Sequence, residues 1–172
     1  MDNLQFMEEH TREEVFEQVC TFLTDKGFRI ADFDQERPWG GFFVIDERQA
    51  PDFLREFFPH LALDEFSSFS RLSPKILIVA PGKRLSWQYH HRRSEIWKVI
   101  GGNAAVAVSD NDEETEYRRH KAGSIITLEK GERHRLIGMD QWGVIAEIWQ
   151  HTDPDNPSDE EDIVRLQDDY GR

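Results

Sequence analysis

The sequence has very little cysteine and no long apolar segment. Cys20 is the single cysteine among 172 residues, so no disulfide can form within the chain. The first ten residues lack the basic start and apolar run of a secretory signal. No apolar run approaches the roughly 20 residues that are needed to span a bilayer. These absences favour a reducing compartment and no membrane partner, and we expect a cytoplasmic location.

Positive charge is also scarce. The formal net charge is −13, which argues against nucleic acid or an anionic membrane surface as a partner. The charge is unevenly distributed, however, because residues 81–135 hold 11 of the 21 Lys and Arg but only 8 of the 34 Asp and Glu. A locally basic segment in an acidic chain suits a small anion. Basic side chains at strand ends in water would give the same count.

Short strand-like runs are what the sequence contains in quantity. From Arg37 onward, runs rich in β-branched and aromatic residues alternate with turn residues such as Pro81-Gly82 and Gly101-Gly102. Many short strands spaced about 8–12 residues apart predict an antiparallel barrel or jelly roll. The runs are residues 41–45, 75–80, 85–90, 95–100, 104–109, 115–120, 124–128, 133–137 and 142–149.

Two segments have helical spacing instead. In residues 11–26, Thr11 and Glu14 have the form of a capping box, and Gly27 is a typical stop signal. In an insertion at about residues 50–70, apolar side chains recur at helical spacing until Pro59. We therefore predict an all-β fold with two added helices, one near the N-terminus and one short and inserted.

The remaining segments complete the predicted organisation. Residues 151–162 are rich in acid, proline and asparagine, which predicts a solvated loop, and residues 163–172 predict a final helical turn. We expect an N-terminal helical extension over residues 1–36 and a barrel over residues 37–172.

A group of potential metal ligands follows from strand alternation. Gln88 and His90 point to the same face of one predicted strand. If residues 91–94 form a hairpin loop, Glu95 lies across from His90 on the neighbouring strand. A second predicted hairpin offers His134 on the strand that leaves it. In a jelly roll these two hairpins can lie close enough for the four side chains to converge.

The chemistry of this group suits a divalent metal. Two imidazoles, a carboxylate and an amide carbonyl fit a borderline ion such as Zn, Co, Mn, Fe or Ni. With water or substrate in the remaining positions, such a site acts as a Lewis acid. The same spacing also occurs in a solvated strand edge, so spacing leaves both interpretations open.

Longer motifs point to a known family. The stretch PGKRLSWQYHHRRSEIWKVIGG (residues 81–102) resembles the first cupin motif of the type II phosphomannose isomerases, a domain often fused behind a mannose-1-phosphate guanylyltransferase. Further matches follow in the same order: RPWG (37–40), GERHRL (131–136) and EEDIVRLQDDYGR (160–172). Residues 1–36 have no such counterpart, and nothing resembles the nucleotidyltransferase half.

This resemblance implies a cupin β-barrel with one divalent metal ion, zinc first among the candidates, held by Gln88, His90, Glu95 and His134. It implies the isomerisation of mannose 6-phosphate to fructose 6-phosphate, in which a base moves a proton between C1 and C2. Arg93 falls on the family's functional arginine. A homodimer is also expected from the resemblance.

The sequence departs from the family pattern at two positions near the glutamate. Where the family usually has His-His-His-Arg-Ala-Glu-His-Trp, this chain has HHRRSEIW, so Arg92 and Ile96 replace histidines. The alternative is therefore a cupin that binds a sugar or sugar phosphate without turnover. A third candidate, oxygen chemistry with iron, is disfavoured because such sites rarely use an amide ligand like Gln88.

Five further residues are candidates for the site. His91 and Glu147 have side chains that can transfer a proton, although alternation aims His91 away from His90, and a solvated or ion-paired Glu147 is the simpler interpretation. Trp39 could stack on a sugar ring or belong to the core. Arg135 and Arg165 could reach a phosphate or form surface salt bridges.

Overall fold

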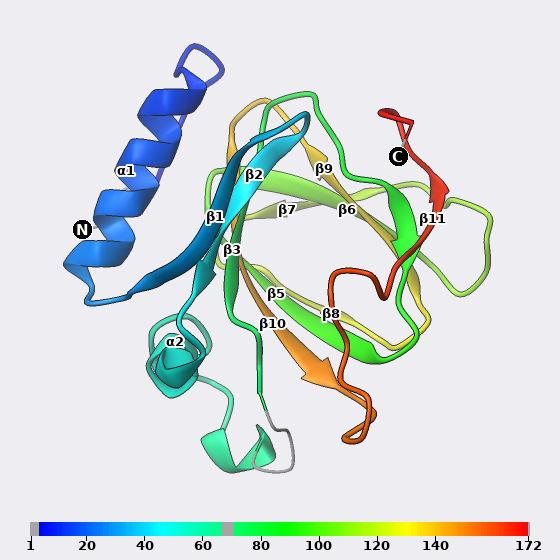
Figure 1. Ribbon diagram of the computed structural model, residues 1–172. Helices are drawn as coiled ribbons and strands as arrows, with labels where there is room; N and C mark the ends of the chain where they lie inside the picture. The colour runs from blue at the N-terminus through cyan, green and yellow to red at the C-terminus, as the bar shows by residue number, and fades with distance from the viewer. Residues whose placement is uncertain (1–3, 67–70, 172) are drawn as a thin grey trace.

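Two antiparallel sheets face one another in the computed structural model, which describes residues 4–66 and 71–171 (Figure 1). The strand order is β1-β2-β3-β10-β5-β8 in the six-stranded sheet and β11-β4-β9-β6-β7 in the five-stranded sheet. This arrangement confirms the predicted cupin-type jelly roll with added helices.

The strands of the six-stranded sheet are β1 (Ile30–Arg37), β2 (Gly40–Ile45), β3 (Lys75–Val79), β5 (Arg93–Gly101), β8 (Ile125–Leu128) and β10 (Gly143–His151). Those of the five-stranded sheet are β4 (Trp87–Tyr89), β6 (Asn103–Ser109), β7 (Arg118–Lys121), β9 (Arg133–Gly138) and β11 (Val164–Gln167). Strands β1 and β11 have no counterpart among the predicted runs.

Two apolar cores lie on opposite faces of the six-stranded sheet. Successive side chains of a strand point to opposite faces, so Trp97 and Val99 of β5 point between the sheets while Ile96 points outward. The inner core also contains Leu136 of β9, whereas the outer core contains Ile148 of β10 and the apolar faces of the helices. Each strand therefore contributes to both cores.

The helices cover the outer face of the six-stranded sheet (Figure 1). Helix α1 (Arg12–Asp25) begins with the predicted capping box: the Thr11 hydroxyl accepts from the main-chain N–H of Glu14, whose carboxylate accepts from that of Thr11. Helix α2 (Ala50–Phe57) buries Phe53 beside the short 3-10 turns η1 (Glu47–Gln49) and η2 (Leu63–Phe66). Residues 67–70 of the expected insertion lie outside the described residues.

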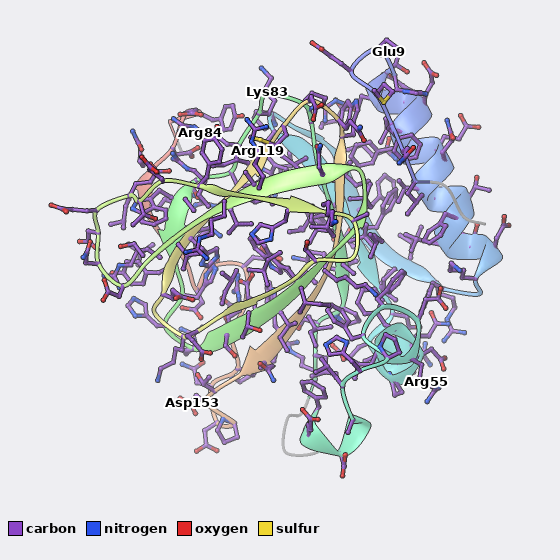
Figure 2. The ribbon with its side chains drawn as sticks, turned by 180° about the vertical axis from the view of Figure 1, so that it is seen from behind. Glu9, Arg55, Lys83, Arg84, Arg119 and Asp153 are labelled. Carbon is purple, nitrogen blue, oxygen red and sulfur yellow. The ribbon has the colours of Figure 1, made fainter. Side chains whose placement is uncertain are left out.

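The helices and the barrel share the outer core, so the N-terminal segment packs directly on the sheet. The expected division between residues 36 and 37 falls within β1, which pairs with β2. None of the helices in the described part of the chain is long and apolar enough to cross a membrane. Charged side chains such as Arg55, Lys83 and Arg119 point outward from the surface (Figure 2).

Two predictions about the C-terminal part were wrong. Residues 164–167 form strand β11, which pairs with β4, and not a helical turn, because β4 offers an unpaired edge that an extended segment can cover. The segment 151–162 is not simply a solvated loop, because the side chains of His151, Ser158 and Asp162 are buried. The reason lies in the hydrogen bonds that Asp162 makes, described below.

Candidate functional site

Three of the predicted ligands meet between the two sheets. The ligand atoms of His90, Glu95 and His134 all lie within 4.8 Å of one another, and the three side chains are buried. His134 lies in β9 and His90 directly after β4, both in the five-stranded sheet, whereas Glu95 lies in β5 of the opposite sheet.

The prediction that His90 and Glu95 lie on the two strands of a hairpin was wrong. The prediction that they lie close together was confirmed. Strand β4 pairs with β9 and β11, while β5 pairs with β10 and β8. The chain crosses from the five-stranded to the six-stranded sheet between these residues, as connections between the two sheets of a jelly roll do. The histidine and the glutamate therefore meet across the barrel interior.

The hydrogen bonds at the outer ring nitrogens set the form of both histidines. Nδ1 of His90 lies 2.7 Å from the carbonyl oxygen of Asp162, and Nδ1 of His134 lies 3.1 Å from that of Glu132. A carbonyl oxygen only accepts, so each Nδ1 carries a proton and each ring directs its Nε2 to the interior. This is the orientation that metal-binding histidines adopt.

The inner ring nitrogens of the two histidines differ in their surroundings. Nε2 of His134 is buried and makes no hydrogen bond, and burial lowers the pKa of His134 to about 4, so the ring is neutral near pH 7. Nε2 of His90 lies 3.0 Å from a carboxylate oxygen of Glu95. The Nη2 atom of Arg93 lies 3.3 Å from the same nitrogen of His90. These donors therefore fit a divalent metal ion.

Glu95 is ready to bind a cation. Burial alone would raise its pKa, but the opposing effects, of which the charge of Arg93 is the largest, hold the pKa well below the ordinary value of a glutamate. Arg93 donates from Nε to Glu95 at 2.8 Å, and its guanidinium lies 3.6 Å from the centre of the Trp149 ring. Arg93 is thus placed beside the predicted ligands, as expected.

Gln88 lies next to the group on β4, paired in register with His134. Its amide nitrogen is 3.4 Å from Nε2 of His90, and its oxygen accepts from Ser86 at 2.6 Å. Turning the amide by 180° presents the oxygen to the histidines and leaves the nitrogen to donate to the hydroxyl of Ser86. The side chain can therefore provide the fourth ligand that the sequence predicted.

The segment after β10 supports the site from outside. The Asp162 carboxylate accepts from the main-chain nitrogens of His91 and Arg92, both at 2.9 Å, and from Ser158 at 2.6 Å. These bonds outweigh the effect of burial and lower the pKa of Asp162 to about 2. Ser158 also accepts from Arg93. This segment therefore holds both His90 and Arg93, which explains its buried polar side chains.

Glu147 is the second carboxyl of the site, and the expectation of a solvated or ion-paired group was wrong. It is buried on β10 and accepts hydrogen bonds from the indole nitrogens of Trp97 and Trp149, at 2.7 and 2.9 Å. Burial and then the negative charge of Glu95 raise the pKa of Glu147 to about 8. Two neighbouring carboxyls thus have pKa values that are shifted in opposite directions.

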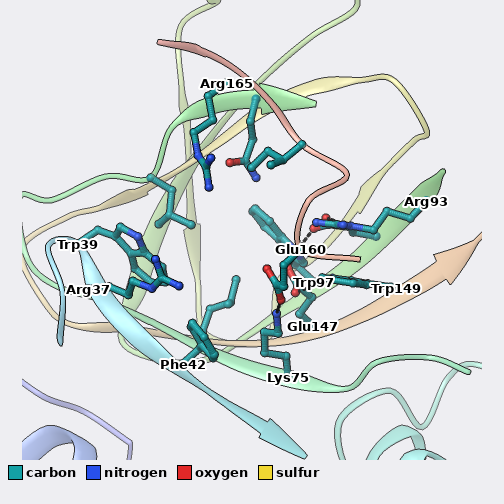
Figure 3. Close-up of a pocket in the computed structure, with 15 residues that line it drawn as sticks. Arg37, Trp39, Phe42, Lys75, Arg93, Trp97, Glu147, Trp149, Glu160 and Arg165 are labelled. Carbon is teal, nitrogen blue, oxygen red and sulfur yellow. Dashed lines mark hydrogen bonds and ion pairs between the residues drawn. The ribbon is translucent and has the colours of Figure 1, made fainter. Parts of the chain in front are cut away.

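A pocket of about 100 Å³ between the sheets is lined by Gln88, Arg93, Glu95 and Glu147 of this site (Figure 3). The predicted residues Trp39 and Arg165 line it, and the buried indole nitrogen of Trp39 has no hydrogen-bond partner. Sequence reasoning missed three lining residues with charged side chains: Arg37, Lys75 and Glu160. Arg37 and Glu160 are the first residues of the motifs RPWG and EEDIVRLQDDYGR. Their place in these motifs was the only feature of the sequence that could have identified them.

Two predicted residues lie elsewhere. His91 is exposed and packs edge-on against Tyr89, with the ring centres 5.3 Å apart. Arg135 is fully buried, and its guanidinium donates to the side chain of Glu114 and to the carbonyl of Gln167. Neither residue lines the pocket. Arg135 connects β9 to the end of β11, so it is not a surface residue either.

Comparisons with known proteins show the family of this chain. Residues 55–168 match the family described as mannose-6-phosphate isomerase, C-terminal. The chain belongs to this family. The matched residues include all four predicted ligands as well as Arg93 and Glu147.

Members of this family occur within much longer proteins. The chain is 31% identical over 136 residues to the xanthan biosynthesis protein XanB of Xanthomonas campestris, which covers 79% of this chain and 23% of XanB. It is 32% identical over 114 residues to the alginate biosynthesis protein AlgA of Pseudomonas aeruginosa, covering 66% of this chain and 22% of AlgA. This chain thus spans less than a quarter of the length of these relatives.

Solved structures show the same fold at low identity. The capsular polysaccharide assembling protein CapF of Staphylococcus aureus superposes with a TM-score of 0.54 at 15% identity, over 90% of this chain and 37% of CapF. An oxalate decarboxylase of Lactobacillus farciminis gives a TM-score of 0.53 at 19% identity, over 84% of this chain and 35% of the enzyme. These similarities concern the fold alone.

The two departures from the family pattern lie outside the pocket. Ile96 points to the outer face of the six-stranded sheet, where it packs in the outer core. Arg92 lies in the turn between the sheets and contacts Asp159 and Asp162 at 3.7 and 3.9 Å. Neither residue lines the pocket.

Proposed function

We propose that this chain is a metal-dependent aldose–ketose isomerase that acts on a sugar phosphate, with mannose 6-phosphate and fructose 6-phosphate as the pair to test first. The carrying observation is the buried group of His90, Glu95 and His134, because Glu95 of this group lines one pocket together with a second carboxyl, Glu147. Membership in the mannose-6-phosphate isomerase C-terminal family supports the choice of substrate.

Glu147 is the group we assign to proton transfer. An aldose–ketose isomerase moves a proton between C1 and C2, and a carboxyl with a pKa near the working pH can both accept and return it. The raised pKa of Glu147, about 8, meets this requirement, and two indole N–H groups fix the orientation of its carboxyl. A divalent ion held by His90, Glu95, His134 and Gln88 would supply Lewis-acid stabilisation of negative charge on the substrate oxygens.

Arg93 has a supporting part in this proposal. All of its donors are directed at the protein: Nε at Glu95, Nη1 at Ser158 and Asp159, and Nη2 towards His90. It therefore keeps Glu95 ionised and oriented, and adds positive charge to the site. Direct contact with the substrate is not required of it.

The alternative, a domain that binds the sugar phosphate without turnover, depended on the missing histidine at position 96. Ile96 points away from the pocket, so a histidine there would not contact a substrate in it. This orientation favours the isomerase over the non-catalytic alternative.

The test is to load the protein with zinc, cobalt or manganese and to add mannose 6-phosphate in D2O. Proton NMR follows the formation of fructose 6-phosphate and the entry of deuterium at C1 and C2. We expect product with the native chain and with Glu113→Gln, an exposed control, and at least a hundredfold slower turnover with Glu147→Gln. Binding of the sugar phosphate without product or exchange would overturn the isomerase proposal.

A further inference from the structure

Lys75 is a buried cation on the wall of the pocket. Its ammonium lies 5.0 Å from the centre of the Phe42 ring and 4.7 Å from that of Trp149, and it forms an ion pair with Glu160 (Figure 3). The side chain of Lys75 is 7% exposed, whereas that of Glu160 is 71% exposed. The two partners therefore differ greatly in their access to water.

This difference determines which partner can leave. A buried ammonium without a negative partner is costly, because it has lost its hydration and gains nothing in return. An exposed carboxylate that moves away is simply hydrated. Glu160 is therefore an exchangeable partner, whereas the ammonium of Lys75 stays in the pocket and is stabilised by whichever anion lies beside it.

The surroundings of the ion pair suit a ligand anion. Arg37 and Arg165 line the same pocket, and Figure 3 shows the carboxylate of Glu160 directed at the ammonium of Lys75. The buried indole N–H of Trp39 offers a further donor without a partner in the protein. A phosphate carries more negative charge than a carboxylate and three acceptor oxygens, so it can satisfy several of these donors at once.

We propose that Lys75 is the anion-binding residue of this pocket and that Glu160 occupies its place until a phosphate monoester replaces it. The identity of the sugar rests on the function proposed above, but the exchange of one anion for another does not. Glu160 then acts as an internal competitor that weakens the binding of phosphorylated ligands. Neutral sugars cannot replace it, so the pair also favours phosphorylated over neutral ligands.

Equilibrium binding of mannose 6-phosphate and of mannose tests this without requiring turnover. The indole ¹H–¹⁵N signals of Trp39 and Trp149, which line the pocket, report on occupancy, while those of Trp87 and Trp142, which do not line it, serve as internal references. Titrations use both the metal-free and the zinc-loaded protein, since zinc can itself attract a phosphate.

We expect Glu160→Gln to bind mannose 6-phosphate more tightly than the native chain by about threefold to tenfold, because the buried ammonium then lacks its internal partner. Glu161→Gln makes the same change of charge at an exposed neighbour and should leave the affinity within about twofold, as expected for a screened surface charge. Binding of mannose should not change in either variant.

Lys75→Met should weaken binding of mannose 6-phosphate by about tenfold or more, the usual loss for a charge-assisted contact. Lys83→Met, at an exposed position, is its matched control. The proposal would be overturned if the native chain and Glu160→Gln bound mannose 6-phosphate equally well, both without metal and with zinc. Glu160→Gln changes only an exposed side chain. This test therefore does not depend on whether Lys75→Met folds. The affinities for mannose 6-phosphate can follow this order even if the protein has no isomerase activity. The two proposals are therefore tested separately.

Discussion

The two faces of the six-stranded sheet use the same strands for different purposes. On the inner face, Glu95, Trp97 and Glu147 line a polar pocket, whereas on the outer face Ile96 and Ile148 pack in an apolar core with the helices. Successive residues of one strand therefore alternate between lining the pocket and packing in the apolar core that stabilises the fold. Ile96 directly follows Glu95 in the sequence, but its side chain lies on the opposite face of the sheet and does not line the pocket.

The largest effect on stability should come from the outer face. Phe53→Ala in α2 removes a fully buried ring and is expected to cost about 3–5 kcal/mol of unfolding free energy, measured by urea denaturation. The metal affinity of the folded variant should stay within about twofold of the native value, because sites that share no contacts act independently. A parallel loss of metal affinity would break the proposed separation of the two faces.

The largest effect on metal binding should come from the inner face. Glu95→Gln removes the charged ligand and is expected to lower zinc affinity at least about a hundredfold, beyond the usual range for loss of a supporting residue. Competition with a chromophoric chelator measures this. Ile96→Val, one position along the strand, is the control and should leave the affinity unchanged.

Glu147 should give the inner face a distinctive pH dependence in the metal-free protein. Its folded pKa of about 8 lies above its ordinary value of 4.5, so the folded state holds a proton that the unfolded state releases. Stability due to this group is therefore complete below pH 4.5 and is lost as pH rises towards 8.

Between pH 6.5 and 7 the slope should be about −1.4 kcal/mol per pH unit for one such group, and it should be about half as steep at pH 8, where the folded group is half deprotonated. This window avoids the opposite contribution of His134, whose lowered pKa of about 4 makes stability fall as pH drops below 6.5. Urea denaturation at several pH values checks the slope. Glu147→Gln should abolish it and Glu113→Gln should retain it; a slope unaffected by Glu147→Gln would contradict the assignment.

A smaller effect is expected where the loop supports the inner face. Asp162→Ala removes the acceptor for the turn after β4 and should lower zinc affinity about tenfold, as loss of a supporting hydrogen bond usually does. Isothermal titration calorimetry measures the affinity. Asp155→Ala, an exposed aspartate of the same segment, should have no effect. Equal affinities of the two variants would show that the loop does not position His90.

The smallest effect on function is expected from restoring the family histidine. Ile96→His places an imidazole in the outer core, so turnover and metal affinity should change less than about twofold, while unfolding free energy falls by about 1–3 kcal/mol. Parallel activity assays and urea denaturation separate the two outcomes. A large gain in turnover would mean that position 96 communicates with the pocket after all.

Much of the fold and the ligand set could be predicted from local patterns. The capping box at Thr11 and the alternation of short runs depend on neighbouring residues only, and both were confirmed. The group of His90, Glu95 and His134 was also predicted, but for a reason that was partly wrong: alternation gives the face of a strand, whereas which strands are paired depends on the whole chain.

The rest depended on burial, which a single sequence does not specify. A glutamate in a strand, such as Glu147, is usually solvated, and only the closing of the barrel encloses it beside Glu95 and two indoles. Lys75 and Glu160 are 85 positions apart, so their pairing had no local signal. The expected homodimer stays a prediction, which light scattering of the purified protein can test.

The candidate ligands come from both sheets, and this has a mechanical consequence. His90 and His134 belong to one sheet and Glu95 to the other, so an ion bound by all three would act as a cross-link between the two layers. Opening the barrel would require breaking coordination bonds as well as separating apolar side chains. Metal would then raise the resistance of the whole domain to unfolding, by an amount that grows with the logarithm of its concentration above the dissociation constant.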